Sequence, residues 1–260
     1  MRRVRSASRV EKRAPASVRA AMDVFQPEEA GVAALTLSAC GYSVFDAAED
    51  ISESNDNGLA DGKVVTTAVA TIGAFTKVQA MGPDDIVFVT GDAFSIKAEG
   101  DAAVIKKLRY NLKDGAIIIG RAKGKLWDDD DGDVTITITA PSLAEASLAG
   151  SGSFTADKMA GDEVVLATAG SGDLKVGTVS GRRLDGKIAG SGDISVAGKM
   201  ETADLAVLGS GSIDGEKLTV AVAEASIAGS GDISLNASDK VAANVAGSGS
   251  INVTGGAKCS

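Results

Sequence analysis

The chain lacks histidine altogether, and only two of its 260 residues are cysteine. Without imidazole it has neither a Ser-His-Asp triad nor a zinc–imidazole site, and the commonest general base is missing. Cys40 and Cys259 form no Cys-x-x-Cys motif and no disulfide framework, although a single bond between them stays open as an alternative. These absences predict a protein that is not an enzyme and needs no cofactor.

Aromatic residues and prolines are also scarce. The chain has one Trp, two Tyr, six Phe and four Pro, against 32 Gly. At 44% hydrophobic residues it is too apolar for a disordered chain, and its glycine content suits a fold with many tight corners and thin aliphatic layers. No run of 18 apolar residues occurs, so no membrane-spanning helix is expected.

Positive charge is scarce outside the first residues. Residues 1–21 contain seven Lys or Arg and one acid, Glu11, so their net charge is +6. Because the whole chain has a net charge of −9, the remaining residues have a net charge of −15. Phosphate groups would repel such an acidic body. The composition therefore argues against nucleic acid as a partner.

The N-terminal region contains a short apolar run that ends in Leu37-Ser38-Ala39-Cys40. This pattern is typical of a lipobox and predicts lipidation at Cys40, with export to the periplasm, the outer membrane or the cell surface. Glu28 and Glu29 lie where a signal peptide normally has positive charge, so the alternative is an N-terminal tail with a chance match. We expect a leader over 1–40 and a flexible acidic tether over 41–63.

The segment 64–142 has the composition of a strand-rich region. Asp101 can cap a short helix over 101–112, in which Val104, Ile105 and Leu108 recur at helical spacing. Strands are expected within 63–81, 85–92, 94–101, 115–123 and 133–141. An acidic loop separates the last two of these strands.

Residues 143–260 contain an internal repeat. Gly-Ser-Gly occurs six times, at intervals of 20, 20, 19, 20 and 18 residues. Each copy predicts a corner, because glycine accepts positive φ and lets neighbouring backbones approach without a Cβ between them. The predicted corner glycines are Gly150, Gly152, Gly170, Gly172, Gly190, Gly192, Gly209, Gly211, Gly229, Gly231, Gly247 and Gly249.

Aliphatic and polar residues alternate on both sides of each corner, as in Asp193-Ile194-Ser195-Val196. This pattern predicts an all-β fold, a parallel β-helix with coils of about 20 residues. Each coil would contain two or three strands of about 4–5 residues, stacked about 4.8 Å apart. A narrow core is expected around inward-facing alanines, namely Ala144, Ala146, Ala223, Ala225 and Ala243.

The repeated "AGSGDI" and "GSGSIN" corners, after the "VTITITAPSLAEASLAGSG" segment, resemble the head GIN domain family of auto-transporter adhesins. The resemblance covers about residues 64–256, including the short helix and the Ile138–Pro141 transition. It implies a secreted or envelope-anchored bacterial protein with a right-handed β-helix, preceded by a strand-rich part with one short helix. It implies no enzymatic mechanism.

Carboxylates are the remaining candidates for chemistry. Asp173 and Asp193 follow successive corners and would lie about one strand spacing apart, where a calcium ion could bind weakly. Local hydrogen bonds at the turn are the simpler interpretation. The "WDDDDGDV" stretch (127–134) partly resembles an EF-hand loop, but Trp127 takes the first ligand position, so an exposed hairpin loop is expected.

Three other site types fit the sequence poorly. A glycosidase pair at Asp173 and Asp193 would lack aromatic residues to hold sugar, because Phe154 is the only aromatic residue from 150 onward. No helix is expected after Gly170-Ser171-Gly172, as a dinucleotide fingerprint requires. Threonine is too sporadic in the coils for an ice-binding ladder.

Two functions are compatible with such a solenoid. The first is a surface adhesion module that contacts an unknown protein or glycan through a flat polar face. The second is a structural envelope spacer that self-associates. The last strand-like segment, Ser250-Ile251-Asn252-Val253, offers an open ladder to a partner or a second copy, unless further chain completes it. A homodimer through this coil, with Cys259 close to the junction, is therefore expected.

Overall fold

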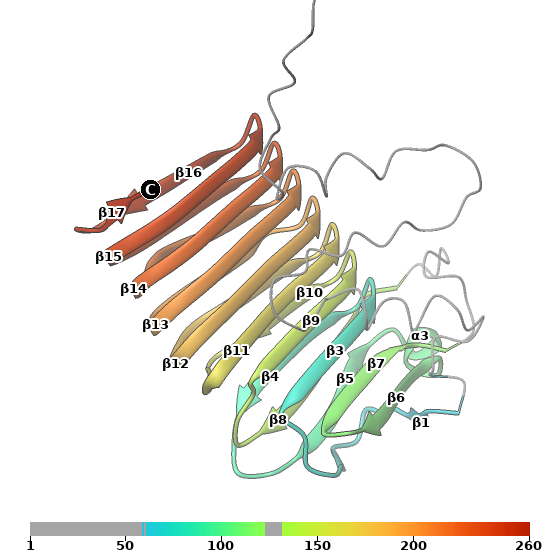
Figure 1. Cartoon of the computed structure of the whole chain (residues 1–260). Coiled ribbons are helices and arrows are strands. Elements are labelled where there is room, and N and C mark those ends of the chain that lie inside the picture. Colours follow the sequence, from blue (N-terminus) through green and yellow to red (C-terminus); the bar gives the residue numbers. More distant parts are fainter. Residues whose placement is uncertain (1–58, 60, 123–131) are drawn as a thin grey trace, which may run out of the picture. The chain divides into compact units, whose positions relative to one another are not determined.

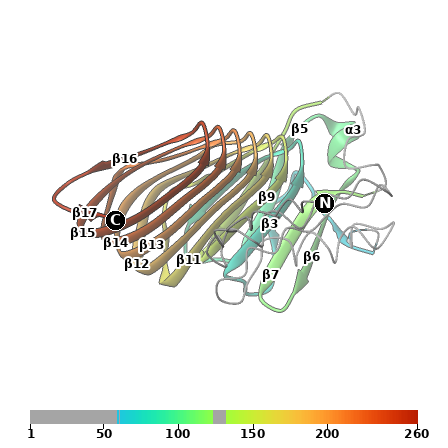
Figure 2. The same ribbon diagram turned by 45° about the horizontal axis from the view of Figure 1, so that its top comes forward.

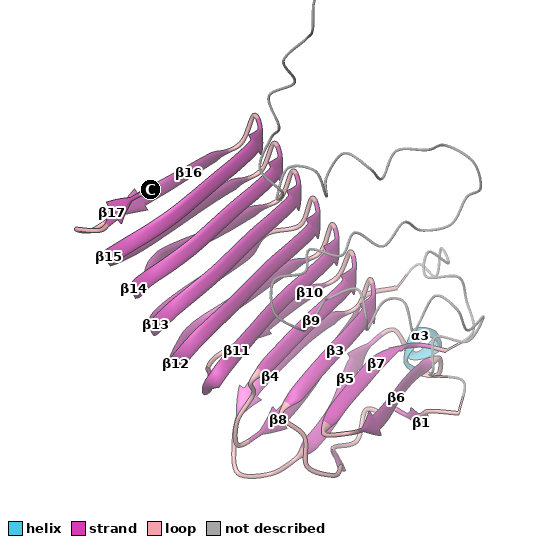
Figure 3. Cartoon of the chain, in the orientation of Figure 1, coloured by secondary structure: helices cyan, strands magenta, loops and turns pink. Residues whose placement is uncertain are grey.

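The computed structural model describes Leu59, residues 61–122 and residues 132–260 (Figure 1). All the described residues belong to one compact unit. The expected leader, Cys40 and nearly all of the tether lie outside the described residues. Within the described part almost every element is a strand (Figure 3).

The GSG repeat forms a parallel β-helix. The strands β12 (Asp173–Gly190), β13 (Ile194–Gly209), β14 (Ser212–Gly229) and β15 (Asp232–Gly247) each run from one corner to the next. Each pairs in parallel with its successor, with the first glycine of every corner in register. The corners therefore line up along one side of the stack (Figure 2). This confirms the predicted solenoid with one coil per repeat.

Shorter strands complete the stack on both sides of these four coils. They also pair in parallel with their neighbours in the stack. They are β9 (Glu145–Gly150), β10 (Ser153–Ala156) and β11 (Met159–Gly170) before β12, and β16 (Ser250–Thr254) and β17 (Lys258–Cys259) after β15.

The expected strand length of about 4–5 residues is wrong for the central coils, whose strands span 16 to 18 residues. The chain does bend within each coil, but the ladder between coils continues around most of the bend. Only local register shifts mark it, for example between Val176 and Val179 of β12. Glycine with positive φ stands beside this bend in β13, at Gly198, but its register partner in β14 is Leu218, so glycine does not recur there from coil to coil.

The N-terminal part begins the same stack. β3 (Lys77–Gly82) and β4 (Asp85–Thr90) form a coil that pairs in parallel with β9 and β10. On the other side of this coil, β7 (Ala116–Arg121) pairs with β3 and β8 (Val134–Ala140) with β4. Antiparallel strands then close that end, namely β6 (Leu108–Lys113), β5 (Ser95–Gly100), β1 (Lys63–Val64) and β2 (Ala70–Thr71).

The helix expected over 101–112 is only half right. Asp101 does cap a helix, accepting from the backbone N–H groups of Ala103 and Val104 at 2.7 and 3.0 Å, but α3 spans only Ala102–Ile105. The residues after it form β6, in which Leu108 and Tyr110 are buried and pair antiparallel with β7. The ladder with β7 outweighs the helical spacing of the aliphatic residues.

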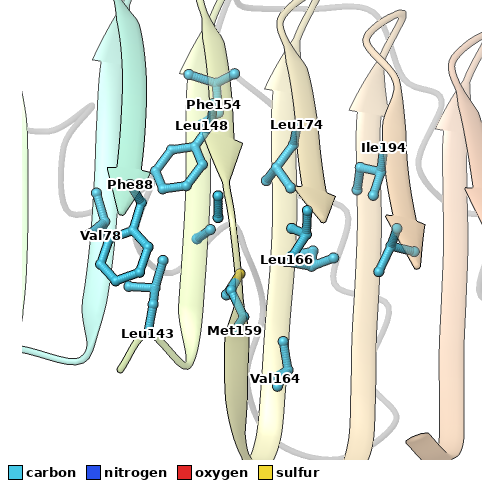
Figure 4. Close-up of a cluster of buried hydrophobic side chains, with 14 of the residues drawn as sticks. Val78, Phe88, Leu143, Leu148, Phe154, Met159, Val164, Leu166, Leu174 and Ile194 are labelled. Atoms are coloured by element: carbon cyan, nitrogen blue, oxygen red, sulfur yellow. The ribbon is translucent and has the colours of Figure 1, made fainter. Parts of the chain in front are cut away.

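One hydrophobic core runs through the stack. Its largest fully buried side chains lie in the N-terminal coils, where Phe88 and Phe154 are on neighbouring strands (Figure 4). Ala146, Ala223 and Ala225 are buried as predicted, which keeps the later coils thin. Two alanines depart from the prediction, since Ala144 is only half-buried and Ala243 is exposed, the latter because no described coil stacks beyond it.

Candidate functional site

Each corner requires glycine at two positions, the first and the third residue of the Gly-Ser-Gly motif. The first glycine of each corner has positive φ, as in Gly190 at 134°, where a side chain would be strained. Backbone contact excludes a side chain at both positions: a Cβ on Gly190 would lie 2.1 Å from the carbonyl oxygen of Gly170, and one on Gly192 would lie 2.0 Å from that of Gly172. The third glycine has no positive φ, so contact alone constrains it. The other corners repeat this arrangement, with positive φ and contact at Gly150, Gly170, Gly209, Gly229 and Gly247, and contact alone at Gly152, Gly172, Gly211, Gly231 and Gly249.

The residues that follow the corners form a column of Asp and Ser, and hydrogen bonds within this column link adjacent coils. The Asp193 backbone N–H donates to Oδ1 of Asp173 at 3.1 Å, and the Ser212 N–H donates to Oδ1 of Asp193 at 2.8 Å. Ser250 makes the same bond to Asp232 at 3.0 Å. One oxygen of each of these carboxylates is thus occupied by the backbone of the next coil.

A corner that the sequence analysis missed precedes the six repeats. Gly82 has positive φ and lies in register with Gly150, and Asp85 accepts from the Ser153 N–H at 3.1 Å. The signal was present in the residues themselves, because Gly82-Pro83-Asp84-Asp85-Ile86 matches Gly190-Ser191-Gly192-Asp193-Ile194 at its first and last two positions. The absence of the second glycine concealed it.

Asp84 takes the place of the third corner glycine and forms a buried ion pair. Its carboxylate accepts from Nη2 of Arg121 at 2.8 Å and from Nε at 3.0 Å. Both side chains are largely buried, at 3% and 12% exposure. The same guanidinium donates to the Gly132 carbonyl at 3.1 Å. The pair ties β7 and the chain before β8 to the first corner.

No group of three Asp, Glu, Cys or His side chains among the described residues is arranged to hold a metal ion. Asp173 and Asp193 do lie in adjacent coils, but each carboxylate accepts a hydrogen bond from a backbone N–H group of the next coil. Most of the acidic 127–134 stretch, including Trp127, lies outside the described residues.

A broad polar face covers the half of each coil that follows the corner. It consists of two rows of outward-facing residues, in register from coil to coil, and none of them is buried. The first row is the corner column: Asp85, Ser153, Asp173, Asp193, Ser212, Asp232 and Ser250. The second row is Thr137, Val87, Thr155, Lys175, Ser195, Asp214, Ser234 and Asn252.

The polar face is acidic and hydrogen-bonding in character. It carries five aspartates against one cation, Lys175, and the remaining residues are hydroxyl or amide side chains apart from Val87. No aromatic residue belongs to either row. Such a surface can attract positive charge and form many hydrogen bonds, but it has no ring on which a sugar could stack.

A second acidic row runs along the other half of the coils. Asp185, Asp204 and Glu224 are register partners in β12, β13 and β14. Burial and then the charge of Asp185 raise the pKa of the Asp204 carboxyl above 3.8. Lys187 and Arg183 partly neutralise the row, with Lys187 Nζ 2.8 Å from Asp185 and Arg183 Nη2 3.4 Å from Asp204.

A stack of glycine-cornered coils, closed at its N-terminal end by antiparallel strands, defines a β-solenoid. The family model described as "Putative auto-transporter adhesin, head GIN domain" matches residues 74–257. The chain belongs to this head GIN domain family. The resemblance predicted from the repeated corners is thereby confirmed.

Three solved structures from two bacterial species have the same fold. A Bacteroides fragilis protein described as a "putative adhesin" is 21% identical, with a TM-score of 0.64, over 75% of this chain and 100% of that one. A Parabacteroides distasonis protein described as a "Putative lipid binding protein" is 25% identical, with a TM-score of 0.60, over 74% and 90%. A "putative adhesin" of the same species is 20% identical, with a TM-score of 0.58, over 77% and 93%.

A search of curated proteins found no relative. Within the part of the chain that the structure describes, no helix is long and apolar enough to cross a membrane. The family and its neighbours fit an adhesin-like surface or envelope protein.

Proposed function

We propose that the chain is a non-enzymatic adhesion module of the bacterial envelope, and that it binds a basic protein surface through its polar face. The observation that carries this proposal is the register of the two polar rows, which repeats hydroxyl, amide and carboxylate groups over successive coils. A flat, repetitive surface of this kind suits an extended contact rather than the enclosure of a small molecule.

The sign of the charge selects the class of partner. Five aspartates against Lys175 favour a partner rich in Lys and Arg, because complementary charge speeds association and disfavours acidic competitors. A glycan is the less favoured ligand, since neither row supplies an aromatic ring. The exposure of these side chains at rest means that little rearrangement is required for contact.

The chemistry of the face supports binding over catalysis. The carboxylates of Asp173 and Asp193 each accept a backbone N–H from the next coil, which supports a structural role for both. The sequence also has no histidine to act as a general base. We further propose export and lipid anchoring through Cys40, supported by the Leu37–Cys40 pattern.

A charge-reversed pair of variants tests the proposal. Asp214 and Glu224 are exposed acids of the same strand, β14, but Asp214 belongs to the polar face and Glu224 to the other acidic row. The chain is measured against immobilised Lys-rich and Glu-rich peptides of equal apolar content, and against a glycan array. We expect saturable binding to the Lys-rich peptides, weakened about tenfold or more by Asp214→Lys and less than threefold by Glu224→Lys, since a lost close charge pair costs about 1.5 kcal/mol or more.

Equal losses in the two variants would mean non-specific attraction to an acidic protein and would contradict the proposed face. Saturable binding to a glycan that Asp214→Lys abolishes would replace the basic protein by a sugar as the ligand. A self-associating spacer without a foreign ligand, the alternative function, predicts no saturable binding to any of these probes.

A further inference from the structure

The coil that ends the described stack leaves part of the core uncovered. Val245 is in register with Ile227, yet it is 41% exposed whereas Ile227 is 2% exposed. Ala243 is likewise exposed, although its register partner Ala225 is fully buried. Val245 is in the register position of an inward-facing residue, and it is exposed because no described strand lies on its far side. On that side, Ala243 is beside the last described residue only, since its backbone N–H donates to the backbone oxygen of Ser260 at 3.1 Å.

Backbone groups are also unpaired at this end. The Leu174 N–H donates to Asp193, one coil further on, so residues in the Leu174 position point toward the next coil. Register carries this orientation through Ile194, Ile213 and Ile233 to Ile251. The N–H and C=O groups of Ile251, and of Val253 two residues later, therefore point away from β15 toward the open side, where no described strand pairs with them.

The open end has few of the charges that normally protect a sheet edge, since Lys258 on β17 is the one charged side chain from residue 241 to the last described residue. Residues 241–257 contain no Asp, Glu, Lys or Arg, whereas the preceding 20 residues contain Glu224, Asp232, Asp239 and Lys240. Natural edge strands are usually short, bulged or charged to prevent pairing with another chain. β16 has five paired residues in a regular ladder and none of these devices.

The opposite end of the stack is protected. Its outermost strands, β1 and β2, have only two residues each. Arg109 and Lys113 on β6 and Lys97 and Glu99 on β5 add charge beside them. Stacking of one chain's open end on another chain's N-terminal end is therefore disfavoured, and an association between two open ends is favoured.

We infer that the open end is a docking surface for a second copy of this chain. The Ser250–Thr254 strands of two copies pair antiparallel about a two-fold axis, so that the free Ile251 and Val253 groups bond to their counterparts. Because 241–257 is uncharged, no antiparallel register of this segment places like charges opposite each other. The contact also covers Val245 and closes the core. This inference is independent of the proposed ligand of the polar face.

Two valines of equal exposure provide a matched test. Val222 and Val245 are both 41% exposed, but Val222 lies on β14, within the stack, and Val245 lies at the open end. Sedimentation equilibrium is run on the full chain over a range of micromolar concentrations, with reductant. Wild type and Val222→Lys should have twice the mass of one chain at high concentration, and Val245→Lys should have the mass of one chain throughout.

A second variant and a second readout separate docking from stability. Ile251→Pro removes an N–H that points to the open side while leaving those that point to β15. It should be monomeric, with a far-ultraviolet circular dichroism spectrum like that of wild type. Hydrogen exchange at Ile251 and Val253 should slow as the wild-type concentration rises and stay unchanged in Val245→Lys. A wild-type monomer at every concentration, equal dissociation of both lysine variants, or growth beyond a dimer would each overturn the inference.

Discussion

The Cα of Gly192 lies so close to the coil before it that an ideal Cβ there would be 2.0 Å from the carbonyl oxygen of Gly172. No side-chain rotation can relieve this contact, since both atoms are fixed to the backbone. The coils can therefore stack at this distance only because the residue at this position has no side chain.

Corner substitutions should accordingly destabilise the solenoid. Gly192→Val and Gly190→Val should each lower the free energy of unfolding by about 2 kcal/mol or more, through backbone overlap in both and through strained φ in Gly190→Val. Chemical denaturation measures the change. Gly256→Ala is the control, because its nearest contact would be an ordinary 3.7 Å and its φ is not positive. Unchanged stability in both valine variants would contradict the corner assignment.

Strain and overlap can be separated at the first corner. Gly82 has a φ of 110°, but a Cβ there would meet no atom within 4 Å. Gly82→Ala should therefore cost only about 1–2 kcal/mol, from φ alone, and less than Gly190→Ala, where the Gly170 carbonyl oxygen lies 2.1 Å from the new Cβ. Equal losses by denaturation would show that backbone strain, and not contact between coils, dominates at the corners.

The buried Asp84–Arg121 pair should matter far more than exposed pairs. Arg121→Met leaves the Asp84 carboxylate buried without its charged partner and should cost about 3 kcal/mol or more. The control is Arg182→Met, which removes an exposed pair with Asp162 and should cost less than about 1 kcal/mol. Thermal or urea unfolding distinguishes the two. Similar small losses would mean that solvent reaches the Asp84 carboxylate.

The stability of the chain should respond to pH through Asp204. Because burial and Asp185 raise the pKa of this carboxyl, its charged form is disfavoured in the folded protein. The resulting destabilisation is fully present above the raised pKa and is relieved as the pH falls toward 3.8. Asp204→Asn should therefore raise the free energy of unfolding at neutral pH and lose this advantage below 3.8. Denaturation at several pH values tests this, and a loss of stability at neutral pH would show that the contact with Arg183 dominates.

Lipidation at Cys40 is tested in a bacterial host. The wild-type chain should incorporate labelled palmitate and sediment with membranes, and Cys40→Ser should do neither, because the thiol is the acceptor of the lipid. Cys259→Ser serves as the control and should behave as wild type. Absence of label in wild type expressed from either Met1 or Met22 would contradict the lipobox.

The solenoid was predictable because its constraint is local and periodic. Each corner needs glycine for positive φ at one position and for close backbone contact at another, as at Gly190 and Gly192. The same short motif therefore recurs in each coil. Alternation around Ile194 and Val196 then defines the inner face. The second bend of each coil left no such periodic signature, because a glycine such as Gly198 in one coil is replaced by Leu218 at the same position of the next.

The parts that escaped prediction depend on partners distant in sequence. Leu108 and Tyr110 are buried by pairing with β7, so the helical spacing before them could not reveal their conformation. The corner at Gly82 is completed by Gly150, and the polar face exists only once the coils are stacked in register. Single residues such as Thr155 and Ser195 carry no signal of their own.

The pairing of Gly82 with Gly150 has a consequence for how the molecule is assembled. The first corner and its neighbour in the stack are separated by nearly seventy residues, so this junction cannot form until the intervening segment has been synthesised. Every later coil needs only the one before it, some twenty residues back. We therefore expect closure of this one long loop to be the slow step for the first coil, whereas each later coil can add to a neighbour that is close in sequence.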